Sequence, residues 1–196
     1  MNINFLRNNL IIRKLICKYE YNRADNILKK IYKHLGKKSK IIDIGAGTCL
    51  LSEAIQQKGH VVKSIDVQDL NFSKKIKLTL YDGDTLPFKK NAFNVSLLIF
   101  VLHHISNPIK TLKEANRVSK QIIIMDDIYT SKLSKNYTHF VDDLQNMFLE
   151  KNPHTNKSDN EWKKTFKDLG LILKHAEYYK SKINIQHAIY YLESTS

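Results

Sequence analysis

The chain has 196 residues, 42% hydrophobic and 26% charged, which is the composition of one ordinary globular domain. No run of 18 or more apolar residues occurs, which excludes a membrane-spanning helix, and six glycines and three prolines exclude a collagen-like or low-complexity chain. Two cysteines, Cys17 and Cys49, cannot build a disulfide framework, and no signal peptide is recognised. We therefore expect a cytoplasmic protein and leave a peripheral association with a membrane open.

The net charge of +13 is concentrated at the start of the sequence. Residues 1–40 hold eleven basic and two acidic side chains, so this segment alone carries +9. Such an arm favours an anionic partner, either a membrane surface or RNA, and no DNA partner is expected. The alternative is a compositional bias, because 28 of the 32 basic residues are lysines in a chain rich in Asn and Ile. The sequence does not indicate the oligomeric state.

The predicted elements begin with two helices and continue as alternating strands and helices. Residues 5–19 are compatible with a helix that packs on the domain, covers a pocket, packs on a partner or lies at a membrane surface. Residues 22–35 have apolar side chains at helical spacing. We expect strands over 40–44, 60–65, 77–81, 94–100 and 121–125, and helices over 48–58, 68–72, 107–119, 137–149 and 159–169. Continuous Ile, Val and Leu in these strands indicate a parallel sheet covered on both faces.

The chain is expected to end in an antiparallel hairpin. Strands over 171–180 and 183–192 would be joined by the two residues Ser181 and Lys182, and so short a link allows only antiparallel pairing. The pattern therefore predicts an α/β fold with a doubly wound, mostly parallel sheet that ends in an antiparallel hairpin.

A glycine-rich turn follows the first predicted strand. Gly45, Ala46, Gly47 and Thr48 come directly after a buried strand and before a helix, where glycines let the backbone approach a ligand and the helix offers free N–H groups. This arrangement is typical of a nucleotide-type cofactor site. A dinucleotide fingerprint would have a third glycine where Leu50 stands, so a dinucleotide is not favoured.

With Asp43 added, the turn resembles the Asp-x-Gly-x-Gly motif of class I S-adenosylmethionine-dependent methyltransferases. The resemblance implies that Asp43 orients the glycine turn and the amino-acid end of the cofactor; Cys49 stands where the family often has a third glycine. An acid at the end of the second strand, about 20 residues on, suits ribose hydroxyls, so Asp66 is expected there, with Val67 packed on the adenine.

Residues 81–95 carry the resemblance further, toward methyltransferases with a ubiquinone-biosynthesis-like core (the methyltransferase 11 type). The resemblance implies that Asp82 accepts a hydrogen bond from the adenine amino group and that Gly83 offers a backbone N–H, with Asp84 as the competing carboxylate. The implied fold is a Rossmann-like seven-stranded sheet with helices on both faces. The implied cofactor is S-adenosyl-L-methionine, with S-adenosyl-L-homocysteine as the product.

Residues 98–105 follow the fourth strand, where this family places the methyl group. Phe100 would pack near the methionine part of the cofactor, and His104 or His103 would act as a base, with Asp126 as a further candidate. The alternative assigns one histidine to capping a helix and the other to the core. No metal is expected, because the fourth strand ends in Phe100 and not in an acid.

The resemblance extends to an uncharacterised bacterial branch of these enzymes that shares Asp126, Asp142, Asn146 and Trp162 with this chain, which departs from it at Met125, Asp127 and Asp143. The acceptor pocket is expected to be roofed by residues 1–21 and 126–160. Its expected lining residues are Tyr129, Tyr137, His139, Asp142 and Asn146.

One domain over 1–196 is therefore expected. Its parts are a basic helical arm (1–38), a cofactor-binding core (39–128), acceptor-side helices (129–170) and a closing hairpin (171–192). Three hypotheses follow: methyl transfer to a small-molecule or lipid-like acceptor, methylation of RNA such as tRNA through the basic arm, and a non-catalytic binding protein with this fold. The sequence identifies neither the acceptor nor the methylated atom.

Overall fold

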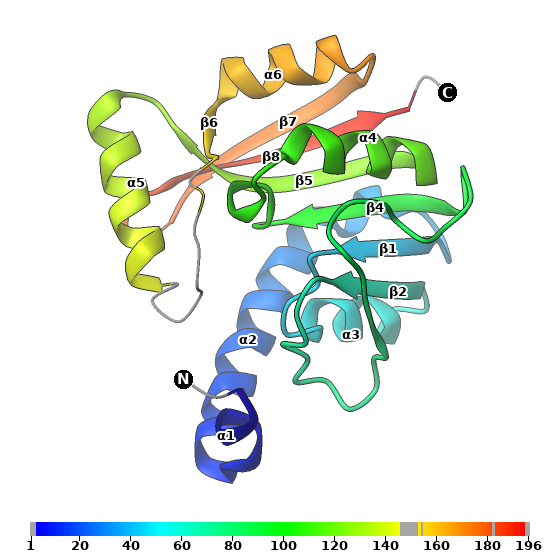
Figure 1. Cartoon of the computed structure of the whole chain (residues 1–196), viewed down its shortest axis with the longest axis vertical. Helices are drawn as coiled ribbons and strands as arrows, with labels where there is room; N and C mark the ends of the chain where they lie inside the picture. Colours follow the sequence, from blue (N-terminus) through cyan, green and yellow to red (C-terminus); the bar gives the residue numbers. More distant parts are fainter. Residues whose placement is uncertain (1–2, 146–152, 154, 182, 195–196) are drawn as a thin grey trace.

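A sheet with the strand order β3-β2-β1-β4-β5-β8-β7 runs through the middle of the computed structural model, which describes residues 3–145, 153, 155–181 and 183–194 (Figure 1). The strands are β1 (Lys40–Ile44), β2 (Val61–Asp66), β3 (Leu78–Leu80), β4 (Phe93–Ile99), β5 (Ser119–Tyr129), β7 (Ile172–Lys180) and β8 (Gln186–Glu193). β1 to β5 are parallel, and β8 lies antiparallel between β5 and β7. The predicted fold class is confirmed.

The sheet has one strand more than the seven expected. The two-residue β6 (Lys157–Ser158) pairs with Ile128 and Tyr129, beyond the last pair that joins β4 to β5. It leads into α6 (Asp159–Asp168), which begins with a capping box in which Ser158 and Glu161 satisfy each other's backbone N–H groups. The strand therefore extends the sheet at the carboxyl end of β5.

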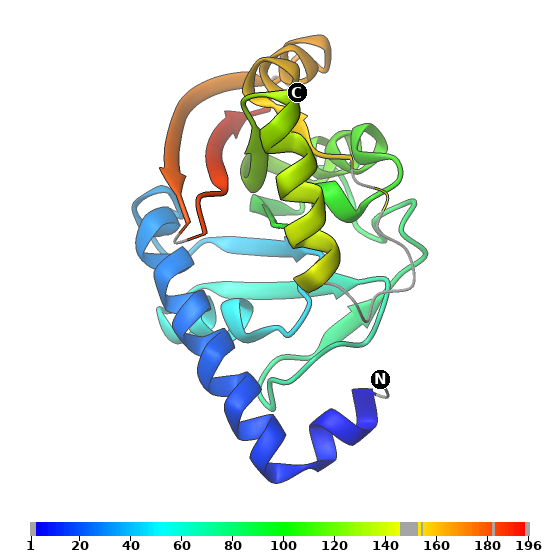
Figure 2. The ribbon, with the colours of Figure 1, turned by 90° about the vertical axis from the view of Figure 1, so that its left-hand side faces the viewer.

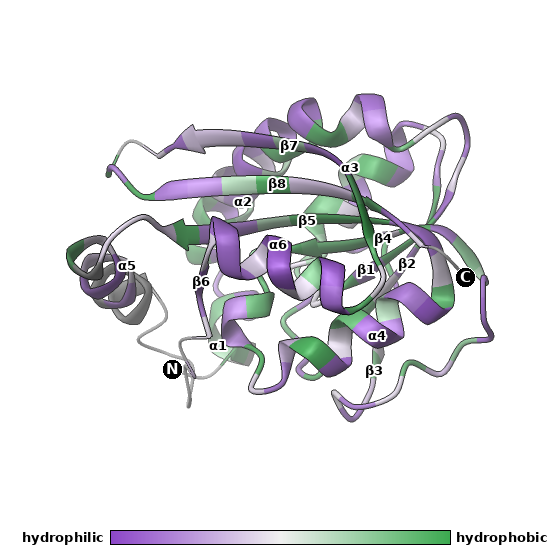
Figure 3. Ribbon diagram, turned by 90° about the horizontal axis from the view of Figure 1, so that it is seen from above, coloured by the Kyte–Doolittle hydropathy of each residue, from purple (hydrophilic) through white to green (hydrophobic). Residues whose placement is uncertain are grey.

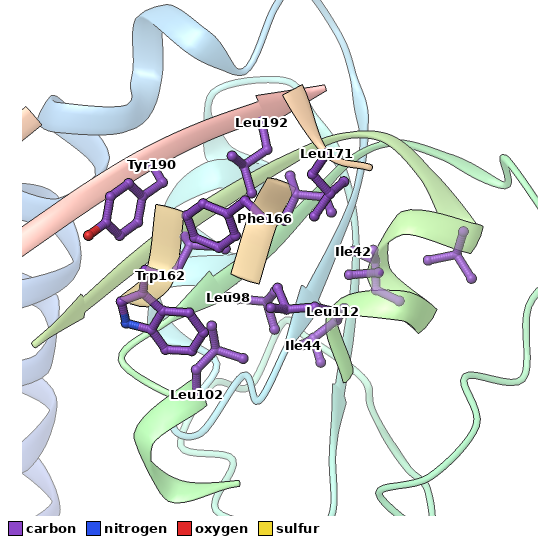
Figure 4. Packing of buried hydrophobic residues seen from close by; sticks show 14 of the residues in the cluster. Ile42, Ile44, Leu98, Leu102, Leu112, Trp162, Phe166, Leu171, Tyr190 and Leu192 are labelled. Atoms are coloured by element: carbon purple, nitrogen blue, oxygen red, sulfur yellow. The ribbon is translucent and has the colours of Figure 1, made fainter. Parts of the chain in front are cut away.

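Two hydrophobic clusters hold helices on the two faces of the sheet. On one face, α4 (Pro108–Val118) and α6 pack on β4, β5 and β8, with Trp162, Phe166 and Tyr190 as the largest side chains (Figure 4). On the other face, α2 (Leu10–Ile31) and α3 (Leu50–Gln57) pack on β1, β4 and β5. Figure 3 shows hydrophobic residues gathered on the central strands and hydrophilic ones on the outer side of α6.

The two N-terminal helices have other boundaries than predicted: the first is short, and the second is long and covers most of both predicted ranges. α1 (Ile3–Asn8) is short, and α2 begins where the Asn9 side chain accepts hydrogen bonds from the N–H groups of Ile11 and Ile12. α2 then continues without a break to Ile31 and a short 3₁₀ turn, η1 (Tyr32–His34), because no helix-breaking residue interrupts it. Its first half continues past the sheet beside the loop that follows β2, with α1 folded back at its end (Figure 2).

Two local predictions were wrong. Residues 68–72 form no helix, because Asp69 and Asn71 turn their side-chain oxygens onto backbone N–H groups two residues on. The link between β7 and β8 spans residues 181–185 instead of two residues, closed by a bond from the Ser181 N–H to the Ile185 carbonyl. Antiparallel pairing, the consequence drawn from the short link, is present all the same.

The remaining helices lie near their predicted positions. α5 spans Lys132–Gln145, and the rest of the helix expected over 137–149 lies outside the described residues. A 3₁₀ turn, η2 (Leu102–His104), follows β4. α4 is capped by Asn107, whose side chain accepts from the Lys110 N–H, with Pro108 at the first helical position. None of the described helices is both long and apolar enough to cross a membrane.

Candidate functional site

The glycine turn between β1 and α3 is held in a backbone conformation that glycine favours. Gly45 and Gly47 have φ angles of +73° and +49°. At Gly45 a Cβ would lie 2.2 Å from the Val101 side chain, so the segment after β4 packs directly against the turn, whereas at Gly47 a Cβ would meet no atom within 4 Å. Cys49 closes the turn with a φ of +60°, at the position where a third glycine was expected from the resemblance.

Asp43 is buried beneath this turn. Its Oδ2 accepts a hydrogen bond of 2.6 Å from the Ser52 hydroxyl, which in turn accepts one of 2.7 Å from Ser64. Burial, with a smaller contribution from the nearby Asp66, raises the pKa of Asp43 to about 6 against the opposing effect of the Ser52 bond. A carboxylate so costly to bury, held at the end of a central strand, is characteristic of a functional position.

Asp66 ties the end of β2 to the glycine turn. Its Oδ2 accepts from the Gly47 N–H at 2.8 Å, and its Oδ1 accepts from the N–H groups of Val67 at 2.7 Å and Gln68 at 3.3 Å. A carboxylate has room for about four hydrogen bonds, so the side chain keeps acceptor capacity toward the adjoining cavity. The strand-end acid and the glycine turn, predicted from separate motifs, therefore lie together.

A first cavity of about 300 Å³ opens beside Asp66. Its lining brings together six of the residues predicted to bind the cofactor, with Lys110 beside them; the six are Gly45, Asp66, Val67, Asp82, Gly83 and Asp84. Asp84 forms an ion pair of 2.7 Å with Lys110. The Asp82 side chain instead accepts from the N–H groups of Asp84 and Thr85, which lowers the pKa of Asp82. The two competing carboxylates thus have different partners.

A second cavity of about 270 Å³ lies on the other side of the glycine turn. It shares Gly45 and His104 with the first cavity and includes the predicted residues Asp43, Ala46, Gly47, Thr48 and Phe100. Helix α2 supplies the opposite wall through Glu20, Arg23, Ala24 and Ile27. All eleven residues predicted to bind the cofactor therefore line one or both of these adjacent cavities.

A third cavity, of about 520 Å³, adjoins the second. The two share Arg23, Ile27, Phe100 and His104, and His104 lines all three cavities. The walls of the third cavity come mainly from two segments far apart in the sequence, α2 and the end of the β7–β8 hairpin. Its other lining residues are Tyr19, Asn22, Asn26, Lys30, His103, Asp127, Tyr179, Ser181, Ile183, Ile185 and His187.

Phe100 stands between the second and third cavities in a strained conformation. Its φ of +52° is rare for a bulky residue and is fixed by a 2.7 Å bond from its N–H to the Met125 carbonyl. The Arg23 guanidinium lies over the ring, 5.1 Å from its centroid, and the His187 ring meets it edge-on at 5.4 Å. The aromatic ring is thus held between a cation and an imidazole at the junction of the cavities.

Two histidine–aspartate pairs border the third cavity. The buried His103 is hydrogen-bonded through Nδ1 to the buried Asp126. His187 Nδ1 lies 2.5 Å from Asp127 Oδ1, and both of these side chains are nearly buried. His104, less buried than His103, has its ring centroid 4.0 Å from that of His103. Since Asp126 and Asp127 are successive residues of β5, their side chains point to opposite faces of the sheet.

The residues predicted for the acceptor pocket lie elsewhere or outside the described residues. The Tyr129 hydroxyl donates to Glu161 at the start of α6, and this bond, with others from Ser158, lowers the pKa of Glu161 to about 2. The Tyr137 hydroxyl donates to the Ile183 carbonyl, and His139 lies half-buried on α5. The described linings of the three cavities include none of these three. Asn146 and the side chain of Asp142 lie outside the described residues.

The expected roof over the pocket is also different. Within the expected roof segment 126–160, the Thr155 hydroxyl donates to the carbonyls of Leu102 and Ile105 and so holds residue 155 against η2. The wall of the third cavity is instead formed mainly by α2 and residues 179–187. Three lining residues of the third cavity, Arg23, Asp127 and His187, were not among those predicted from the sequence. The helical spacing of α2 could have indicated which side of the helix carries Arg23. Nothing in the local sequence, however, indicates that residue 187 lies near residue 100. Among the described residues, no group of three or more His, Cys, Asp or Glu side chains is placed to hold a metal ion.

Comparisons with known proteins agree with this geometry. Residues 42–122 match the family described as "Methyltransferase domain". The demethylmenaquinone methyltransferase of Staphylococcus saprophyticus is 30% identical over 125 residues, which are 52% of this chain and 53% of that protein. The chain spans about half of the length of the curated relatives it matches.

Solved structures share the fold over most of the chain. An S-adenosylmethionine-dependent methyltransferase from Methanosarcina mazei has a TM-score of 0.65 at 17% identity and covers 84% of this chain and 96% of its own. A structure described as a putative methyltransferase, from Bacillus halodurans, has a TM-score of 0.64 at 11% identity, with 91% and 100% covered. At these identities the likeness concerns the fold alone.

Proposed function

The chain carries a methyltransferase domain with the class I fold, and on this premise we propose that it transfers a methyl group from S-adenosylmethionine to a small-molecule or lipid-like acceptor in the third cavity. The observation that carries the proposal is the continuity of the site. His104 lines all three cavities, and Phe100 with Arg23 forms the wall between the second and the third. A space for the donor thus adjoins a separate space for an acceptor.

The residues of the first two cavities suit this cofactor chemically. In the proposal, Asp66 receives the ribose hydroxyls, Val67 and Gly83 flank the adenine, and Asp82 accepts from its amino group. Asp43 orients the glycine turn, while Arg23 offers a guanidinium to the cofactor's carboxylate. The open space at Gly47 supports close approach of a ligand, because no side chain of the chain occupies it.

When bound, the cofactor supplies a methyl group on a positively charged sulfur that is open to attack by a nucleophile. The chain's own residues need mainly to hold the two reactants in line and to keep water away. Phe100 and the apolar side of α2, including Ile27, provide such a wall. The strained backbone of Phe100 supports this role, because a strained conformation persists only where the surrounding structure enforces it.

An acceptor that carries an acidic proton also needs a base, and two histidines are candidates. His104, predicted from the sequence, borders both the donor and the acceptor cavities. His187 borders the acceptor cavity, and its bond to Asp127 holds Nδ1, which leaves Nε2 to take the proton. His103 is assigned a positioning role, because its bond to the buried Asp126 anchors η2.

Calorimetric titration with S-adenosylmethionine and S-adenosylhomocysteine tests the donor site. Wild type and Asp25→Ala, which removes an exposed carboxylate of α2, should bind both, and Asp66→Ala should lose at least tenfold in affinity, as expected when charge-assisted hydrogen bonds are lost. Absence of binding to the folded wild-type protein would refute the proposal.

Turnover with a labelled methyl donor separates the alternatives. Transfer to a lipid or small-molecule extract supports the proposed acceptor class, transfer to tRNA supports the RNA hypothesis, and cofactor binding with no transfer to either supports a binding protein. Where transfer is seen, His187→Gln and His104→Gln are compared. The variant that lacks the base should transfer more slowly, and both variants should keep their affinity for S-adenosylhomocysteine within about threefold. A base contributes typically 10²–10⁴-fold, so a loss confined to one variant identifies it.

A further inference from the structure

The first half of α2 carries large apolar side chains that face solvent. Ile11, Leu15 and Tyr19 are 75%, 63% and 68% exposed. They lie four residues apart, so they form one stripe along the helix. This part of α2 extends beyond the body of the domain (Figures 1 and 2). Three adjacent apolar side chains left in water on a protruding helix mark an interaction surface.

The stripe leads to the mouth of the third cavity. Tyr19, its last member, lines that cavity, and Asn22 and Asn26 continue the same side of the helix along the cavity wall. A molecule that covers the stripe would therefore stand at the entrance through which an acceptor reaches the site.

A second apolar ridge lies on the other side of the cavity. Ile183 lines the cavity and is exposed, and its carbonyl accepts the hydrogen bond from the exposed Tyr137 of α5. One turn earlier on α5, Leu133 is 82% exposed. Apolar side chains of α2 and of the β7–β8 link thus border the third cavity on two sides, and Tyr137 of α5 contacts that link from outside the cavity.

The charges beside the α2 stripe are positive. Residues 1–19 contain four basic side chains and no acidic one. Arg7 and Arg13 are engaged within the chain, with Asp69 and the Phe72 carbonyl, whereas Lys14 and Lys18 are exposed on the same helix as the stripe. Aliphatic side chains flanked by lysines are complementary to an anionic lipid surface, which takes up the apolar groups and attracts the cations.

We propose that this rim, made by Ile11, Leu15 and Tyr19 with Lys14 and Lys18 on one side and by Leu133, Tyr137 and Ile183 on the other, docks the chain onto an anionic lipid bilayer. RNA is a poorer fit, because exposed isoleucine and leucine add nothing to phosphate binding. A second copy of the chain is also a poorer fit, because apposed stripes would bring like-charged lysines together. This inference rests on the proposed function for one consequence: if the third cavity holds the acceptor, that acceptor would be a molecule carried in the lipid bilayer.

Sedimentation with vesicles tests the docking. The wild-type chain should bind vesicles of phosphatidylcholine and phosphatidylglycerol at least tenfold more tightly than vesicles of phosphatidylcholine alone. Ile11→Glu combined with Leu15→Glu should reduce binding at least tenfold. Lys14→Gln combined with Lys18→Gln should reduce it about fivefold for each lysine removed and should abolish the preference for the anionic lipid.

Matched controls use exposed apolar residues at the opposite end of the sheet. Val61 begins β2 and Ile172 begins β7, and glutamate at either position should leave vesicle binding unchanged. Every variant is also titrated with S-adenosylhomocysteine, which reports folding and the donor site separately from docking. Loss of cofactor binding in the wild type would therefore count against the proposed function and not against the docking.

Two results would overturn the docking proposal. One is wild-type binding that is absent or is equal for the two kinds of vesicle, and the other is equal binding by wild type and the Ile11–Leu15 variant. Lysine-dependent binding of tRNA in the absence of vesicle binding would assign the surface to RNA. A dimer in sedimentation velocity that the glutamate variant disrupts, again without vesicle binding, would assign it to a second copy.

Discussion

Replacement of Asp43 by asparagine should stabilise the cofactor-free protein at neutral pH while it impairs the proposed donor site. Asp43 is buried, and its pKa is raised from 3.8 to about 6. At about 1.4 kcal/mol per pKa unit, the charged form costs about 3 kcal/mol of the free energy of unfolding. Asparagine has nearly the same shape and carries no charge to bury.

The sign of the effect follows from proton binding. Between about pH 4 and pH 6, the folded state keeps a proton on Asp43 that the unfolded state has lost, so stability falls as the pH rises through this window. Above about pH 6 the full cost is present, and below about pH 4 it is absent. The advantage of Asp43→Asn over wild type should therefore grow by about 3 kcal/mol from acid to neutral pH.

Urea unfolding at a series of pH values provides the assay. The single tryptophan, Trp162, is fully buried and reports the transition by fluorescence. Any pH-independent cost of placing the amide beside Ser52 shifts all values equally and does not affect the slope. Asp25→Asn, on the exposed face of α2, should stay within about 0.5 kcal/mol of wild type throughout. A difference between Asp43→Asn and wild type that stays constant with pH would refute the reasoning.

Two further predictions concern the glycine turn and the cysteines. Gly45→Ala should cost about 1–3 kcal/mol more stability than Gly47→Ala in the same urea assay, because a Cβ at Gly45 collides with Val101 whereas one at Gly47 meets nothing; equal costs would contradict the packing. Burial raises the pKa of the Cys49 thiol to about 12. A thiol reagent at about pH 8 should therefore titrate Cys17 alone in the folded protein and both thiols after unfolding, and two fast thiols in the native state would contradict this.

The strand pattern was readable from the sequence because central strands are buried on both faces. β1 lies where it was expected, and the other strands differ by a few residues at their ends. The boundaries between the helices were harder to predict from the sequence. A continuous α2 was missed because its first half faces solvent, so no apolar periodicity against the core connected residues 5–19 with residues 22–35.

The residues that line the first two cavities were predictable and most of those that line the third were not, for a physical reason. Asp43, Gly45 and Asp66 occupy strand ends and turns whose neighbours are fixed by the order of the strands. The third cavity is built mainly from α2 and from residues 179–187, which approach each other only once the whole sheet is assembled. No local pattern marks His187, whereas Tyr129 and Tyr137, which resemble pocket residues by type, form hydrogen bonds with Glu161 and the Ile183 carbonyl.

The position of β8 between β5 and β7 has a consequence for synthesis. β8 follows every other strand of the sheet in the chain, yet it fills an interior place. Until residue 193 has been made, β5 presents an open edge of backbone donors and acceptors beside Ile122 and Ile124, the kind of edge that pairs with other chains. A chain truncated within β8 should therefore aggregate instead of accumulating as a half-folded monomer.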